Sequence, residues 1–95
     1  MNLDNVLVRN SNLIIDDVED EVIVFNESTQ NTHILNDVAG FLLKTADNIT
    51  AKEVIGRLYD QLSAEDQKTY SLMEISDDCV TFIKELVEQG LLYIA

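Results

Sequence analysis

The first half of the chain carries its apolar residues in short β-branched runs, and the second half carries them at helical spacing. Residues 13–15, 22–25 and 32–35 form three such runs, separated by polar clusters that are typical of turns. They predict three short antiparallel strands. Because the chain passes into helices directly after the third strand, we expect that strand to keep one unpaired edge.

Capping residues place two helix starts in the middle of the chain. Asn36 precedes the first helical segment, and its side chain can accept a hydrogen bond from the free N–H of Ala39. We expect this helix to end near Asn48, since asparagine tolerates left-handed geometry. Thr50 and Glu53 have the spacing of a capping box, which predicts a second helix reaching residue 62.

A third helix is expected from about Ser76 to Gln89, with Gly90 in the left-handed position after it and residues 91–92 folding back over its last turn. Its apolar residues form two stripes, which indicates either deep burial or one face reserved for a partner. The first stripe contains Cys79, Phe82, Ile83 and Leu86, and the second contains Val80 and Val87. Residues 63–75 fit either one further helical turn or a loop, and residues 1–10 fit either a strand or a docked arm.

The length of 95 residues predicts one domain, residues 1–95. The hydrophobic fraction of 46% is typical of a globular protein with a single core. No apolar run approaches the roughly 18 residues needed to cross a bilayer. No secretory signal is visible, and the single cysteine, Cys79, excludes an intrachain disulfide. We therefore expect a reduced, cytoplasmic location and no association with membranes.

The formal net charge of −12 argues against nucleic-acid binding. Two helices joined at residues 47–49 imitate a helix–turn–helix, so a winged-helix DNA-binding regulator is the main alternative function. Acidic residues cancel the basic ones on both candidate recognition helices. A surface of this charge favours a basic partner instead.

No arrangement of residues predicts an enzyme, a cofactor or a metal site. The one histidine, His33, and the one cysteine, Cys79, lie on different elements, and a zinc site would need about four such ligands. The acidic run at residues 16–21 lacks the glycine and the distal glutamate of an EF-hand loop. We expect a non-catalytic protein.

Three short motifs give the chain a resemblance to a known family. They are Leu35-Asn36-x-x-Ala39, Thr50-x-x-Glu53-Val54-Ile55, and Phe82-x-x-Glu85-Leu86-x-x-x-Gly90-Leu91-Leu92. In this order and separation they resemble the PqqD family, the peptide-recognition elements of ribosomally made, modified natural products. The resemblance covers residues 13–93 and implies an α+β, winged-helix-like fold, a three-stranded antiparallel sheet followed by three helices.

The same resemblance implies a function in leader-peptide recognition. Family members hold the leader segment of a precursor peptide and present it to a modifying enzyme, often a radical-SAM protein. The leader adds as a strand beside the third strand and lies against the third helix. In this sequence the corresponding positions are Asn31, Thr32, His33, Ile34, Leu35, Val80, Ile83, Lys84 and Val87.

The physical reading of the sequence agrees with strand addition, because an unpaired strand edge is a docking site for an extended backbone. Two alternatives stay open besides the DNA-binding regulator. One is a protein-interaction module that binds no leader. The other concerns assembly, since the same free edge could pair with a second copy and form a homodimer.

Overall fold

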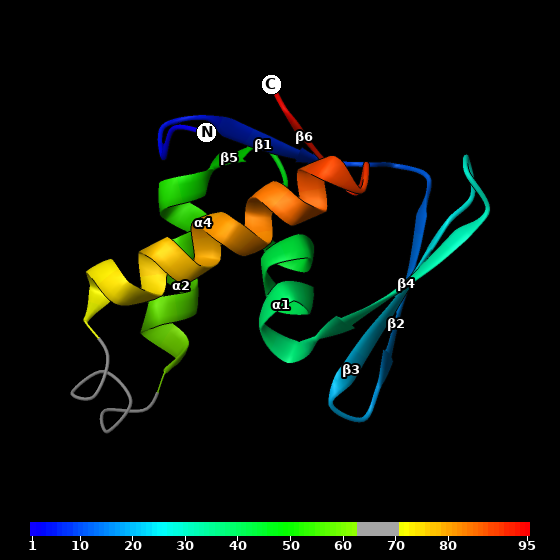
Figure 1. Cartoon of the computed structure of the whole chain (residues 1–95), viewed down its shortest axis with the longest axis horizontal. Coiled ribbons are helices and arrows are strands. Elements are labelled where there is room, and N and C mark those ends of the chain that lie inside the picture. Colours follow the sequence, from blue (N-terminus) through cyan, green and yellow to red (C-terminus); the bar gives the residue numbers. More distant parts are fainter. Residues whose placement is uncertain (63–70) are drawn as a thin grey trace.

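The computed structural model describes residues 1–62 and 71–95 (Figure 1). Within these residues the chain forms three helices and two three-stranded antiparallel sheets. The helices are α1 (Asp37–Thr45), α2 (Ala51–Gln61) and α4 (Leu72–Glu88). The predicted α+β class is confirmed, and a second sheet accompanies the expected one.

The expected sheet consists of β2 (Leu13–Val18), β3 (Glu21–Asn26) and β4 (Asn31–Asn36), in the order β2-β3-β4. Successive strands are joined by tight turns in which Glu19 and Gln30 adopt positive φ angles of 56° and 61°. Figure 1 shows this β2–β4 sheet projecting to one side of the helices. One face packs on α1 through buried Val22 and Leu35, and the other face is turned away.

The second sheet joins the two ends of the chain. It contains β1 (Val6–Arg9), β5 (Ile49–Thr50) and β6 (Leu92–Ile94), in the order β5-β1-β6. The sequence of residues 1–10 fits either a strand or a docked arm, and the structure shows that it supplies the central strand β1. The side chain of Leu7 on this strand is fully buried. Residues 91–92 do not simply fold back over the last helix, because Leu92 starts a strand that pairs with Arg9.

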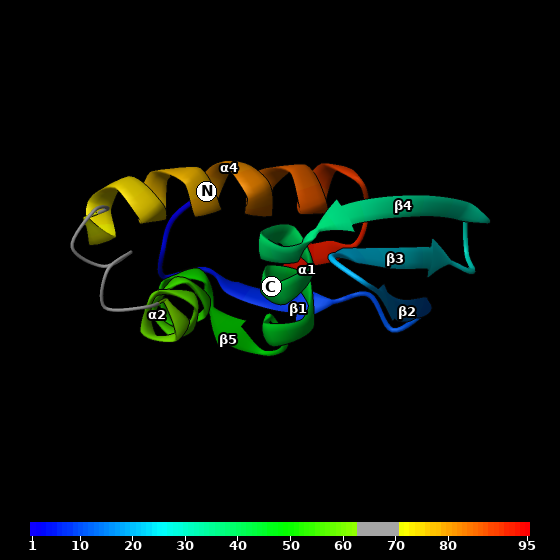
Figure 2. The ribbon, with the colours of Figure 1, turned by 90° about the horizontal axis from the view of Figure 1, so that it is seen from below.

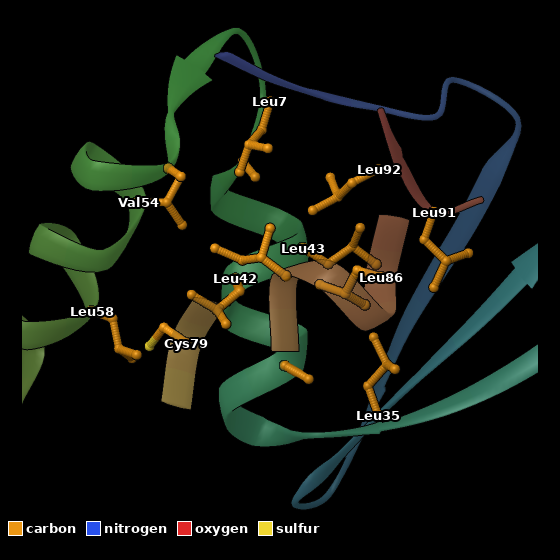
Figure 3. Packing of buried hydrophobic residues seen from close by; sticks show 14 of the residues in the cluster. Leu7, Leu35, Leu42, Leu43, Val54, Leu58, Cys79, Leu86, Leu91 and Leu92 are labelled. Carbon is orange, nitrogen blue, oxygen red and sulfur yellow. The ribbon is translucent and has the colours of Figure 1, made fainter. Parts of the chain in front are cut away.

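The core lies where the three helices meet both sheets (Figure 3). α4 packs against α1 and α2, and Leu42, Ile83 and Leu86 are fully buried between them. Leu7 and Leu92 close the core from the second sheet. Burying a leucine or isoleucine side chain stabilises the fold by roughly 1.5–3 kcal/mol, so this cluster holds the two sheets and the helices in one unit.

The first helix begins where the sequence predicts and ends earlier. The Oδ1 atom of Asn36 accepts a hydrogen bond of 2.8 Å from the N–H of Ala39, which confirms the cap. The helix ends at Thr45, and Arg9 donates to the carbonyl of Lys44 at 2.7 Å, satisfying one of the last free carbonyls. Asn48 does adopt a left-handed φ of 60°, but it lies in the turn that leads into β5.

Only one of the two hydrogen bonds of the predicted capping box forms at the start of α2. Thr50 accepts a hydrogen bond from the N–H of Glu53 at 3.2 Å. The Glu53 carboxylate accepts instead from Arg57, one helical turn later, at 3.1 Å. Because Glu53 pairs with Arg57, its side chain does not accept the hydrogen bond from the Thr50 N–H that would complete the capping box.

The last helix starts five residues earlier than expected. Ser71, not Ser76, is its cap, and Ser71 and Glu74 form a complete capping box. The helix ends in a Schellman motif: Gly90 has φ 75°, and the N–H of Leu91 donates to the carbonyl of Leu86 at 3.0 Å. The further helical turn considered after residue 62 falls on residues 63–70, which lie outside the described part of the chain.

Candidate peptide-binding site

The outer edge of β4 is available for pairing. β4 pairs with β3 along its whole length, from Asn31 opposite Asn26 to Asn36 opposite Glu21. Among the described strands none pairs with the other side of β4. An antiparallel edge strand directs about half of its backbone N–H and C=O groups outward, so this edge can accept an added strand.

A groove runs between β4 and the C-terminal half of α4. It has a volume of about 170 Å³, and Figure 2 shows β4 on the same side of the molecule as α4, with β3 and β2 below it. Its β4 and α1 wall consists of Ile34, Leu35, Asn36 and Ala39, and its α4 wall consists of Phe82, Glu85, Leu86 and Gln89. The free strand edge therefore borders a hollow with an apolar floor, formed by buried Leu35 and Leu86.

A second, larger cavity of about 390 Å³ continues past Phe82 toward the start of α4. It lies between α1, α2 and α4, and its lining is mostly apolar: Val38, Leu58, Leu62, Ile75, Asp78, Cys79 and Phe82. Phe82 belongs to the walls of both cavities. Together they form a track along one flank of α4 that suits the apolar side chains of a bound segment.

Two local features fix the position of β4 relative to the helices. The Asn36 cap joins the last residue of β4 directly to α1, with no intervening loop. Gly40 then lets α1 approach β3 so closely that a Cβ atom at this position would overlap the side chain of Val22. The cap and the close approach of α1 to β3 thus place the strand edge beside the core.

The charges around the groove are negative. Among the residues that line the two cavities, the charged ones are Asp78 and Glu85, and both are exposed. A carboxylate on the wall of an apolar groove favours a cationic side chain in the ligand.

Cys79 forms part of the floor of the larger cavity and is 1% exposed. Burial raises the pKa of its thiol to about 11, and the neighbouring Asp78 carboxylate acts in the same direction. The thiol is therefore protonated near neutral pH and serves as an apolar packing group. Within the described residues no group of three or more metal-binding side chains is arranged to hold an ion.

The structure brings some of the sequence-predicted site residues to the groove. Asn31, Thr32, His33, Ile34 and Leu35 all lie on the free-edged strand, with Ile34 67% exposed and Leu35 buried. The α4 positions predicted from sequence lie elsewhere on the helix. Ile83 is fully buried in the core, while Val80 and Val87 are half-buried against it and Lys84 is exposed.

The groove uses a different flank of α4 from the one chosen by sequence. Phe82, Glu85 and Gln89 follow each other at helical spacing on the side facing β4. At 100° per residue, Val80 and Val87 point about 140–160° away from Phe82, so the core lies between the two flanks. The sequence pattern places Phe82 in the first apolar stripe of the helix and does not single out Glu85 or Gln89. The i, i+3, i+7 spacing of Phe82, Glu85 and Gln89 can be read from the sequence. The sequence does not show which flank of α4 faces β4.

A comparison with protein families assigns this chain to one of them. The family described as "Coenzyme PQQ synthesis protein D (PqqD)" matches residues 21–92, which is more than half of the chain and contains both walls of the groove. The chain belongs to the PqqD family. No curated protein matches it.

The fold of this PqqD-family chain is also similar to a solved structure described as "TbiB1 in Complex with the TbiA(beta) Leader Peptide". The TM-score is 0.73 at 15% sequence identity, covering 93% of this chain and 99% of that one. Similarity at this low identity shows a shared fold over nearly the full length of both chains. Within the described residues, no helix has both the length and the apolar composition that crossing a membrane requires.

Proposed function

We propose that this PqqD-family protein is a non-catalytic accessory protein that binds the leader segment of a ribosomally made precursor peptide and presents it to a modifying enzyme. The leader adds as a strand to the free edge of β4. The single observation that supports this most directly is the coincidence of that edge with the apolar groove along α4. A structurally similar protein, TbiB1, has been solved with a leader peptide.

Backbone pairing alone does not give useful affinity. About four added hydrogen bonds contribute on the order of 1 kcal/mol each, which is offset by the cost of ordering a flexible peptide. Two apolar side chains buried in the cavities beside Phe82 would add roughly 1.5–3 kcal/mol each. With the backbone bonds offset, the two side chains leave roughly 3–6 kcal/mol of binding free energy, which corresponds to a dissociation constant between about 40 μM and several millimolar.

Titration of the leader peptide into ¹⁵N-labelled protein tests the proposal. We expect saturable chemical-shift changes in β4 (Asn31–Asn36) and at Phe82, Glu85 and Gln89. The same spectra test direct peptide contact by Val80, Lys84 and Val87, which stays a prediction from sequence. Changes confined to other elements, or equal changes on adding duplex DNA, would contradict leader binding at the groove.

A pair of charge reversals separates groove contacts from net charge. Glu85→Lys reverses a carboxylate on the groove wall, and Glu88→Lys makes the same change in net charge at an exposed position outside the two cavities. With a leader that carries a basic residue, Glu85→Lys should weaken binding about two- to five-fold, as expected for an exposed ion pair. Equal effects of the two substitutions would show that the groove does not select charge.

Three finer features belong to the same proposal. The chain acts as one domain, residues 1–95, whose strands and helices follow a winged-helix-like arrangement. It works in the cytoplasm, consistent with a single unpaired cysteine, Cys79. The enzyme that receives the leader is of the kind that modifies ribosomally made peptides, often a radical-SAM protein.

A further inference from the structure

The β2–β4 sheet has an apolar face that is turned away from the core. Side chains alternate along each strand, so Ile14 on β2, Ile23 and Phe25 on β3 and Ile34 on β4 lie on the face opposite Val24. The register places Ile14 opposite Phe25 and Ile23 opposite Ile34. These four residues, here called the outer patch, therefore form a continuous group across three strands.

The outer patch is exposed and does not contribute to the core. Ile14 is 53% exposed and Ile34 is 67% exposed, while Ile23 and Phe25 are half-buried. None of the four belongs to the core cluster or packs against it, unlike Leu13 and Ile15 on the inner face. Single exposed apolar residues are ordinary, but a contiguous group across one face of a sheet is typical of an interaction surface.

The charges around the outer patch are acidic. Asp16 lies opposite Ile23 on the same face, and Glu21 precedes Ile23 by two residues on β3. The strands of this sheet contain no lysine or arginine. A partner surface that complements this face has an apolar centre surrounded by lysine or arginine side chains.

We infer that the outer patch is the docking surface for the enzyme that modifies the bound precursor, through an apolar, basic-rimmed surface of that enzyme. This inference rests on the proposed function. A second copy of the chain fits poorly, since each copy carries a net charge of −12 and a face-to-face dimer would bring Asp16 and Glu21 of both copies together. Ile34 lies on the strand that borders the leader groove, so an enzyme docked here is held beside the leader.

The binding experiment uses the purified enzyme encoded together with the precursor peptide. Its affinity for the wild-type protein is compared with that for the double variant Ile14→Ser/Phe25→Ser and for Met73→Ser, which alters a 75% exposed apolar residue on α4. We expect at least ten-fold weaker enzyme binding for the double variant only. Leader affinity, measured separately with the synthetic leader, should change less than two-fold, which also shows that the variant is folded.

A second binding experiment changes only exposed charges near the outer patch, so it removes no apolar packing. Asp16→Lys/Glu21→Lys should weaken enzyme binding and reduce its dependence on salt concentration, whereas Asp60→Lys/Glu88→Lys, with the same net charge on α2 and α4, should not. All four carboxylates are exposed, so these variants should fold normally.

The outcomes distinguish this inference from the proposed function. Failure of the leader to bind overturns the proposed function and leaves enzyme docking as a separate result. Enzyme binding that is absent in the wild type, or unchanged in both outer-patch variants, overturns the inference. A dimer that appears at high salt in sedimentation experiments and is abolished by Ile14→Ser/Phe25→Ser would show that a second copy occupies the patch, and would also overturn it.

Discussion

Two helical glycines, Gly40 in α1 and Gly56 in α2, have opposite surroundings. An added Cβ at Gly40 overlaps the Val22 side chain, whereas at Gly56 it meets nothing within 4 Å. Helix propensity favours alanine over glycine by about 1 kcal/mol at both positions. Only at Gly40 does close packing between helix and sheet oppose that gain.

The two alanine variants should therefore change stability in opposite directions. We expect Gly40→Ala to lower the free energy of unfolding by about 1–2 kcal/mol, because the overlap forces α1 away from β3. Gly56→Ala should raise it by up to about 1 kcal/mol. Urea denaturation followed by circular dichroism measures both, and a stabilised Gly40→Ala would show that α1 and β3 are not in close contact in solution.

The buried thiol of Cys79 lowers the free energy of unfolding as the pH rises into the alkaline range. Its pKa is about 11 in the folded protein, against an ordinary value of 9.0, because burial disfavours the thiolate. The unfolded state therefore loses the thiol proton first as the pH rises, and the free energy of unfolding falls between about pH 9 and pH 11.

The contribution of Cys79 is measured by comparing how the free energy of unfolding depends on pH in the wild type and in Cys79→Ala. The decline in stability from pH 9 to pH 11 should be smaller in the variant. Urea denaturation at each pH provides the measurement, and parallel pH profiles for the two proteins would refute the assigned cause.

At the scale of elements, β3 and β4 differ in how many of their backbone groups are satisfied. β3 pairs on both sides, with β2 and with β4, whereas β4 pairs with β3 alone in the described structure. Within the described residues, no strand pairs with the amides that β4 directs to its outer edge, so they are open to water.

Hydrogen exchange should show this difference directly. In the free protein we expect β3 (Glu21–Asn26) to be protected along its length and alternate amides of β4 (Asn31–Asn36) to exchange fast. Leader peptide should slow those β4 amides, since strand addition gives them partners. Protection that does not change on adding a saturating amount of leader would rule out strand addition at this edge.

At the scale of the whole molecule, the β5-β1-β6 sheet joins the two ends of the chain over the core. Leu92 on β6 is fully buried, whereas its neighbour Tyr93 is 51% exposed. Leu92→Ala should cost about 2–5 kcal/mol, as a large-to-small change in a packed core does. Tyr93→Ala should cost less than about 1 kcal/mol. Thermal unfolding of both variants compares them, and similar costs would mean that the second sheet does not close the core.

Much of the fold was predictable because its signals are local. The Asn36 cap, the three runs of the β2–β4 sheet, the left-handed Gly90 and the buried stripe of Cys79, Ile83 and Leu86 depend on residues within a few positions of each other. The start of the last helix was misplaced because Ser71 and Ser76 are both acceptable caps, and only packing selects between them. The second sheet was missed because its strands are two to four residues long and pair across the full length of the chain.

The sequence by itself determined an acidic α+β chain with an edge strand that leads into capped helices, because alternation, helical periodicity and capping are properties of neighbouring residues. The tertiary structure alone decided which flank of α4 faces β4. That choice follows from how α4 crosses α1 and α2 and how closely Gly40 lets α1 approach Val22. It put Phe82, Glu85 and Gln89 beside the strand edge, whereas Val80, Lys84 and Val87 are not among the residues that line this groove.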